Sequence, residues 1–344
     1  MINLAAFVST IVFILLFRKH AERLGLVDVP GGRKNHEGAV PVIGGIAIFV
    51  AFIFSSFACG QPLDSFHSFF VNLLLLTVVG TLDDLHDLSA RTRFLAQIVA
   101  ALLMTSWGGV FIDDLGNLFG NGTVHLHNWA IPFTVFCVLG VINAFNMIDG
   151  VDGLAGGLVF IALALFGSTA LLAGLTIHAT LIFLLASAVL GFLVFNMRAP
   201  WRSKAAVFMG DAGSMMLGYA LARFAVDLTD SDSRAITPIT AVWILAVPLM
   251  DTVNTMVRRM LKGRSPFSAD REHLHHIFLR AGYSVSRTVV MILSVSLLLG
   301  LIGLAGWHYG VPEYMMFYAF LLLFALYSFA MSHAWKVMKA IKNV

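Results

Sequence analysis

The sequence predicts an all-α integral membrane protein, and two observations lead to that fold class. Of the 344 residues, 59% are hydrophobic and only 12% are charged, whereas an average soluble domain carries roughly 25% charged residues. The apolar residues also form continuous stretches, each close to the about 20 residues that a helix needs to cross a hydrocarbon core. Membrane barrels instead alternate apolar and polar positions, so continuous stretches favour helices.

Eleven stretches are apolar enough to be predicted as transmembrane helices. They cover residues 2–17, 40–59, 67–82, 94–112, 130–147, 154–173, 176–196, 207–226, 237–256, 288–306 and 314–332. The first has no basic residue before it and no small-residue cleavage site after it, so it is predicted to be retained. Cys59 and Cys137 lie inside apolar stretches and are predicted to be packing residues. The connections are mostly short, so residues 1–344 are predicted to form one domain.

Lys and Arg are distributed unevenly between alternate loops. Twenty of the 22 lie in one set of alternate loops and in the tail from residue 333, and the other set holds only Arg223 and Arg234. Cytoplasmic loops are enriched in Lys and Arg, so the basic set is predicted to be cytoplasmic, with the N-terminus outside and the C-terminus inside. The segments richest in chemical groups fall on this side, near residues 83–93, 148–153, 197–211 and 257–287.

The third stretch ends in TLDDLHD at residues 81–87, which holds three carboxylates. In a helix Asp83 and Asp87 would be one turn apart, with Asp84 beside them. Like charges at this spacing repel each other, so the cluster favours a divalent cation or a cationic partner. A solvated helix cap is the alternative, although a cap needs one acidic residue and not three.

Polar side chains recur at every third position where the fifth stretch ends, at Asn143, Asn146, Asp149 and Asp152. With 3.6 residues per turn, they form a slowly winding stripe of amides and carboxylates, and the glycines that follow allow close approach of backbone to a ligand. The pattern is typical of a nucleotide pocket. A glycine turn between two helices would explain the glycines but not two asparagines at membrane depth.

Asp211 lies between two glycines at the start of the eighth stretch. Carboxylates inside a membrane are expensive and are usually functional, so Asp211 is predicted to be a metal ligand. Asp251, near the end of the ninth stretch, is a weaker candidate because it can pair with Arg258 or Arg259.

The longest cytoplasmic loop combines Arg259 and other basic residues with His273, His275 and His276. Basic residues alone are expected in any cytoplasmic loop, but the histidines favour binding of an anion such as a diphosphate. A zinc site is the alternative, and the loop offers no cysteine partner for it.

These segments together resemble a known family. TLDDLHD, NAFNMIDGVDGLAGG, VFMGDAGS and PFSADREHLHH are similar to the motifs of the polyprenyl-phosphate N-acetylhexosamine-1-phosphate transferases, as is PVIGG at residues 41–45. The resemblance runs in the expected order from about residue 30 to 285. The His-Leu-His-His form resembles the WecA-type branch of the family, whereas the peptidoglycan branch usually has three consecutive histidines.

The resemblance implies a role for each matching residue. It implies catalytic roles for Asp83, Asp84, Asp149, Asp152 and His276, substrate contacts from Asn143, Asn146, Arg259, His273, His275 and Lys34, and binding of Mg²⁺, with Mn²⁺ as the alternative, at Asp211. Lys34 matches the family's basic residue before PVIGG only approximately in spacing.

The implied reaction moves N-acetylglucosamine 1-phosphate from UDP-GlcNAc to undecaprenyl phosphate at the cytoplasmic face of a bacterial inner membrane. Membrane lipids are then partners, nucleic acid is not, and a homodimer is left open. Another UDP-N-acetylhexosamine or UDP-MurNAc-pentapeptide is an alternative donor.

A secondary transporter is the alternative class of protein, but the carboxylates of a transporter would lie near the bilayer midplane. An aspartyl-phosphate intermediate also stays open, although the ionised lipid phosphate favours direct attack.

Overall fold

The computed structural model describes residues 2–28, 38–231, 234–265 and 273–333, and these residues are mostly helical. The helices are α1 (Ile2–Arg18), α2 (Gly44–Ala58), α3 (His67–His86), α4 (Ala90–Leu102), α5 (Ala130–Ile148), α6 (Leu154–Leu172), α7 (Thr176–Asn196), α8 (Gly210–Thr229), α9 (Pro238–Ile244), α10 (Ala246–Leu261), α11 (Leu274–Arg280), α12 (Val285–His308) and α13 (Glu313–Ser332). Two short strands, β1 (Val27–Asp28) and β2 (Val40–Pro41), form an antiparallel pair.

Each of the eleven predicted stretches contains a helix, and most of the bounds differ by only a few residues. Within the described residues, six helices are long and apolar enough to cross a membrane: α3, α5, α6, α7, α12 and α13. The number is seven if α9 and α10 form one bent span, while α1 and α2 are shorter apolar helices. The chain is therefore an all-α protein with several membrane spans, and the total of eleven stays a prediction.

The ninth predicted stretch, residues 237–256, is not one continuous helix. It is divided at Leu245, where α9 and α10 meet at an angle of 82°. Pro248 has no backbone N–H to donate to the carbonyl of Ile244, so it cannot continue the helix of α9, whereas proline is well tolerated in the first turn of α10. The break sends α10 in a new direction and carries Asp251 with it.

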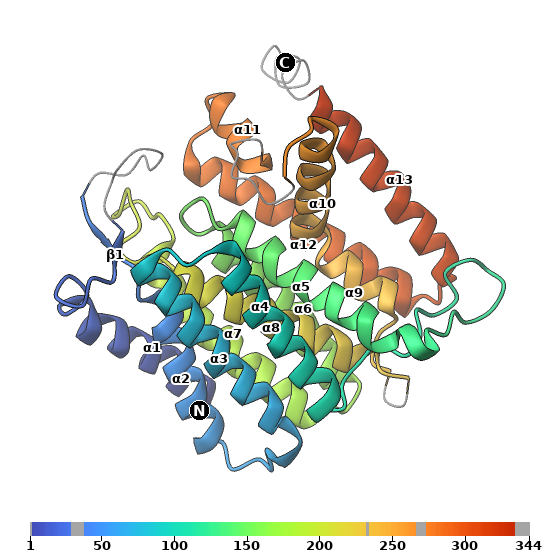
Figure 1. Cartoon of the computed structure of the whole chain (residues 1–344), viewed down its shortest axis with the longest axis horizontal. Coiled ribbons are helices and arrows are strands. Elements are labelled where there is room, and N and C mark those ends of the chain that lie inside the picture. The colour runs from blue at the N-terminus through green and yellow to red at the C-terminus, as the bar shows by residue number, and fades with distance from the viewer. Residues whose placement is uncertain (1, 29–37, 232–233, 266–272, 334–344) are drawn as a thin grey trace.

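Helix α8 runs through the middle of the bundle (Figure 1). It packs against α2, α3, α5, α6 and α9, and 17 of its 20 residues are buried. Helices on its sides separate it from lipid, which explains how it tolerates Asp211, Arg223 and Asp227 within one apolar stretch.

Glycines allow the neighbouring helices to approach α8 closely. A Cβ added to Gly80 of α3 would lie 2.4 Å from the backbone of Ala212, and one added to Gly45 of α2 would lie 2.2 Å from the backbone nitrogen of Gly213. Small residues at such crossings let membrane helices pack backbone to backbone. Two helices, α2 and α3, therefore approach the backbone beside Asp211 closely.

Candidate active site

The amino end of α8 is fixed by a carboxylate from another helix. Asp84, near the end of α3, accepts hydrogen bonds from the backbone N–H groups of Asp211 at 2.9 Å and Ala212 at 3.2 Å. These are two of the donors that a helix leaves unsatisfied at its start, and a negative charge there is favourable. Gly210 has a φ of +73°, and a Cβ at this position would lie 2.6 Å from Oδ2 of Asp84. Glycine is therefore required for this contact.

The side chain of Asp211 is held by α5. Nδ2 of Asn146 donates to Oδ1 of Asp211 at 2.5 Å and to Oγ of Ser214 at 2.9 Å. One carboxylate oxygen of Asp211 is thus oriented by an amide from a residue 65 positions earlier in the chain. Asn146 of the predicted stripe and the predicted metal ligand Asp211 therefore meet.

Asp83 is buried beside Asp84 and has its own partners. Its carboxylate accepts from the backbone N–H of Leu88 at 2.7 Å and from Nη1 of Arg93 at 3.0 Å, and it interacts electrostatically with Asp211. Asp87 does not join this group as predicted, because α3 ends at His86. Asp87 follows in a left-handed conformation with φ 51°, and it is exposed.

Asp149 completes a group of carboxylates around Asp211. It follows the last residue of α5, and burial, together with the negative charges of Asp211, Asp84 and Asp152, raises its pKa to about 7. Carboxylates with insufficient positive charge around them hold protons in this way. The site therefore attracts cations.

Asp152 and Asn196 hold the loop that follows α5. Oδ2 of Asp152 accepts from Nε of Arg198 at 2.7 Å and from the backbone N–H of Ala205 at 3.2 Å. Oδ1 of Asn196 accepts from the N–H of Gly153 at 2.8 Å, and its Nδ2 donates to the carbonyl of Val207 at 2.9 Å. The structure thus gives Asp152 an ion pair that positions the loop.

Asn143 lies one turn before Asn146 and joins α5 to α4. Its Nδ2 donates to Oε1 of Gln97 at 2.7 Å and to the carbonyl of Leu139 at 2.8 Å. These contacts give Asn143 a packing role between two helices. Its predicted contact with substrate stays a prediction.

The predicted histidine cluster begins beside Asp251. The carboxylate of Asp251 is 1% exposed and lies 2.8 Å from Nδ1 of His273. It also accepts from the N–H of Leu274 at 3.0 Å and from the hydroxyl of Tyr327 at 2.8 Å. The carboxylate thus contacts α11 and α13, toward which the bend before α10 turns it, whereas Arg258 and Arg259 on its own helix were the alternative partners.

His275 lies at the contact between the histidine cluster and the loop after α5. A Cβ added to Gly150 would lie 2.7 Å from Nε2 of His275, so the ring touches the backbone beside Asp149. Burial and the neighbouring His276 and His273 lower the pKa of His275 to about 3, against the raising effect of Asp251. The ring is therefore neutral, and among the described residues neither of its buried nitrogens has a hydrogen-bond partner.

Arg259 and Lys34 are the two remaining residues that are predicted to contact substrate, and the structure describes only Arg259. Arg259 lies in the last turn of α10 and is buried. Lys34 lies outside the described residues, and its role stays a prediction.

The donor chemistry at Asp211 fits a Mg²⁺ site that is completed by substrate. Among the described residues, no three His, Cys, Asp or Glu side chains are arranged to hold a metal ion by themselves. Mg²⁺ usually takes one or two protein carboxylates and completes its shell with water and substrate phosphates. Burial and the negative charges of neighbouring carboxylates raise the pKa of Asp149, and a divalent cation would balance these charges.

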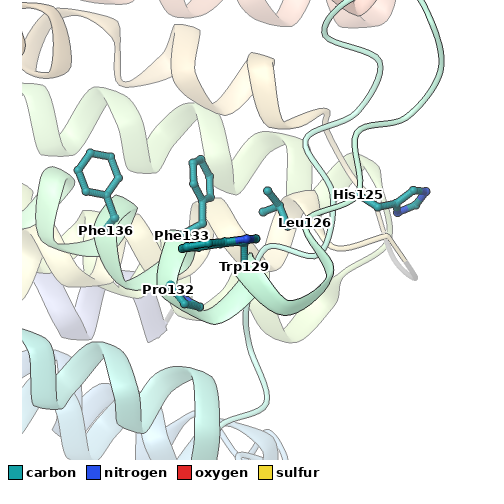
Figure 2. Close-up of a pocket in the computed structure, with 6 residues that line it drawn as sticks. All are labelled: His125, Leu126, Trp129, Pro132, Phe133 and Phe136. Carbon is teal, nitrogen blue, oxygen red and sulfur yellow. The ribbon is translucent and has the colours of Figure 1, made fainter.

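An aromatic pocket lies at the opposite end of α5 from this site (Figure 2). It is lined by His125, Leu126, Trp129, Pro132, Phe133 and Phe136. Its lining is mainly apolar, and aromatic side chains of this kind are common where a protein meets the membrane surface. The residues that line the pocket include none of the carboxylates gathered around Asp211, so it is not the candidate active site.

Comparison with known proteins agrees with this site. The model of glycosyl transferase family 4 matches residues 66–229. The undecaprenyl-phosphate alpha-N-acetylglucosaminyl 1-phosphate transferase of Escherichia coli is 37% identical over 342 residues, which cover 99% of this chain and 93% of that protein. The proteins of the same name from Salmonella typhimurium and Haemophilus influenzae are 38% and 36% identical, over 99% and 98% of this chain and 93% and 95% of their own lengths.

The chain belongs to glycosyl transferase family 4. The stretch matched by the family model contains Asp83, Asp84, Asn146, Asp149 and Asp211. The histidine cluster on α11 lies beyond it but within the region shared with the full-length relatives. The match to the family model therefore covers the carboxylates of the candidate site, and the match to the full-length relatives also covers the histidines.

Sequence reasoning missed three supporting residues, namely Arg93, Asn196 and Ser214. It also missed the hydrogen-bond partners of Asp251. The first three are ordinary residues at helix ends, and no local pattern distinguishes them. Asp251 had a signal, since a carboxylate within an apolar stretch needs a partner. Its true partners are 22 and 76 residues away in the chain, which no spacing rule reveals.

Proposed function

We propose that this chain transfers N-acetylglucosamine 1-phosphate from UDP-GlcNAc to undecaprenyl phosphate and releases UMP. The observation that carries the proposal is the similarity to proteins with this activity in their name, which extends over 98–99% of the chain. The lipid-linked product would be the first intermediate for O-antigen, enterobacterial common antigen or a related envelope polysaccharide.

The site has the groups that two anionic substrates require. Asp211, held by Asn146 and set at the capped start of α8, would bind Mg²⁺ together with the diphosphate of the donor. The bound ion would neutralise the diphosphate and polarise its phosphorus. The neutral ring of His275, whose nitrogens have no partner in the part of the chain that the structure describes, can donate one hydrogen bond and accept another when substrate reaches it.

The reaction is a displacement at phosphorus. An oxygen of the lipid phosphate attacks the β-phosphorus of UDP-GlcNAc, the bond from that phosphorus to the bridging oxygen breaks, and UMP leaves with the electron pair. A phosphate monoester is largely ionised at neutral pH because its second pKa is near 6, so no strong base is needed. Asp84 then acts by holding α8, and Asp83 acts by holding the α3 end through Arg93.

A transfer assay with purified protein tests this function. Protein in detergent with undecaprenyl phosphate and Mg²⁺ should convert radiolabelled UDP-GlcNAc into a chloroform-soluble product, and EDTA should stop the conversion. UDP-GalNAc and UDP-MurNAc-pentapeptide should give much less product. Absence of lipid product from UDP-GlcNAc would refute the proposal, and preference for another donor would correct its substrate.

The proposed location is the bacterial inner membrane, with the site facing the cytoplasm. Besides the excess of basic residues on one side, both arginines on the other side are paired with acids: Arg223 lies 3.1 Å from Asp227, and Arg234 lies 2.6 Å from Asp114. The proposed orientation rests on the count of Lys and Arg, because acidic residues contribute little to this rule.

Cysteine labelling tests this orientation. In a Cys59→Ser, Cys137→Ser background, a membrane-impermeant thiol reagent added outside spheroplasts should label Asn121→Cys and not Arg264→Cys. Both positions are exposed in the structure, so permeabilised cells provide the control in which both react. The reverse pattern in intact cells would overturn the orientation.

A further inference from the structure

The carboxylate of Asp251 lies at the junction of three helices. On α10 it is 1% exposed, Oδ2 accepts from Nδ1 of His273, and Oδ1 accepts from both the hydroxyl of Tyr327 on α13 and the N–H of Leu274. Three hydrogen bonds compensate the cost of burying this charge. A carboxylate with so complete a set of partners has a fixed position.

Asp251 determines where α11 begins. Leu274 is the first residue of this seven-residue helix, and the preceding His273 makes no side-chain capping hydrogen bond. The carboxylate of Asp251 therefore does what a capping side chain usually does, and it does so from a different helix. The start of α11 is tied to α10 and not to its own sequence.

The same carboxylate also fixes the state of His273. A carboxylate only accepts hydrogen bonds, so Nδ1 of His273 must carry the proton, and in the neutral ring the lone pair is then on Nε2. A carboxylate behind an imidazole sets both its tautomer and its orientation. The identity of residue 251 thus determines which ring nitrogen of His273 donates a hydrogen bond.

The position of His273 affects His275 and His276 through contacts between the rings. The rings of His273 and His275 are stacked with centroids 5.9 Å apart and planes within 3°, and those of His275 and His276 are 4.2 Å apart. His275 then contacts Gly150, next to Asp149. A displacement at Asp251 therefore reaches the loop of the candidate active site through two ring contacts.

We propose that Asp251 is a positioning residue for the histidine cluster, which holds the diphosphate of the nucleotide sugar against the loop after α5. Tyr327 supports it from α13 by fixing Oδ1. The inference rests on the proposed function, because it assigns the donor to the histidines. Asp251 touches no reacting atom and acts through His273 and Leu274.

Three variants test this inference. Asp251→Asn keeps the size of the side chain but places its NH2 group either against Nδ1 of His273 or against the donors from Leu274 and Tyr327. Tyr327→Phe removes one of those donors and leaves the carboxylate. Tyr318→Phe is the matched control, because it removes a hydroxyl from the same helix at an exposed position.

The measurement is steady-state transfer with each substrate varied in turn. In Asp251→Asn, kcat/KM for UDP-GlcNAc should fall about 10- to 100-fold, with a raised KM for the donor and an unchanged KM for undecaprenyl phosphate. Tyr327→Phe should raise the donor KM about fivefold. Tyr318→Phe should match the parent protein. Asp251→Glu, which keeps the charge, should recover part of the loss.

A purely structural role predicts a different result. Asp251→Asn would then lower the fraction of active protein and leave both KM values unchanged, which would overturn the inference. If Asp251→Asn does not fold, an unchanged donor KM in Tyr327→Phe would overturn it equally. Lack of transfer in the parent protein would instead refute the proposed function, so the two failures are distinguishable.

Discussion

The two ends of α8 balance their charges in different ways. At the amino end, which we call the Asp211 end, Asp83, Asp84, Asp149 and Asp211 interact with one another. At the carboxyl end, the Arg223 end, two acids are paired with arginines: Asp227 with Arg223, and Asp114 with Arg234. Arg234 also donates to the carbonyl of Thr229, the last residue of the helix, so each end of α8 is met by the charge that its dipole favours.

The difference indicates which end is built for stability and which for a ligand. A protein that buries a carboxylate only for structure supplies a cation with it, as at the Arg223 end. Acids left without enough cations raise one another's pKa and favour a positive ligand. Four expected results test this comparison, from the largest effect to the smallest.

Neutralising Asp211 should abolish turnover. Asp211→Asn removes the charge that would bind Mg²⁺ and keeps the side-chain volume, so the transfer rate should fall about a thousandfold while the protein stays folded. Asp227→Asn on the same helix is the matched control and should keep the rate within about twofold. A near-normal transfer rate in Asp211→Asn would contradict the idea that the Asp211 end binds a ligand while the Arg223 end provides stability.

Removing Arg223 should destabilise the protein without altering the chemistry. Arg223→Met leaves the buried Asp227 with His178 3.9 Å away, too far for a hydrogen bond. The expected loss is about 3–5 kcal/mol in the free energy of unfolding, measured by denaturation in detergent. The double variant Arg223→Met, Asp227→Leu should recover most of it. A double variant no more stable than the single one would show that charge pairing is not what this end provides.

Separating α3 from α8 should weaken both stability and activity. Gly80→Ala forces α3 away from the backbone of Ala212, which should cost about 1–3 kcal/mol and displace Asp84 from the start of α8. The transfer rate should fall at least about tenfold. Gly140→Ala on α5 is the control, because a Cβ there has no atom within 4 Å, and it should leave the rate unchanged. Equal rates for the two variants would contradict the role of the close crossing.

The ion pair between Asp114 and Arg234 should contribute a small, pH-dependent stability. Burial alone would raise the pKa of Asp114, but hydrogen bonds from Arg234 and Gly116 and the charges of Arg234 and His125 hold it below 3.8. A lowered carboxylate pKa means that the stabilisation is fully present above pH 3.8 and is lost as the pH falls through the folded value. Arg234→Gln should cost about 1 kcal/mol at neutral pH, and the difference should shrink in acid. A constant difference would exclude this pair as its source.

Much of the fold and part of the site could be read from the sequence. Continuous apolar stretches located the helices because a helix that crosses the membrane needs about 20 apolar residues. Asp211 and the stripe from Asn143 to Asp152 could be singled out as candidates because polar groups inside apolar stretches are costly and are usually functional. The same logic placed Asp87 in the cluster, and there it failed, because the end of α3 depends on one left-handed residue.

The parts that could not be predicted depend on contacts between distant segments. Asp84 as the cap of α8 joins residues 127 positions apart, and Asn146 reaches Asp211 across 65. The contact between Gly150 and His275 is set by the direction of α10, which depends on an 82° bend. Local periodicity reports which side chains share a face of one helix, and it carries no information about which helices meet.

The central place of α8 also bears on how the protein enters the membrane. Of the helices that surround it, α2, α3, α5 and α6 all precede it in the chain, so a ribosome completes most of the enclosure before the helix that fills it. With Asp211, Arg223 and Asp227, α8 is a poor substrate for release into lipid by itself. The insertion of α8 should therefore require that the earlier helices remain near the translocon. A nascent chain stalled at residue 209 would lack α8, and the glycine-lined faces of its other helices would be exposed to chaperones and quality-control proteases.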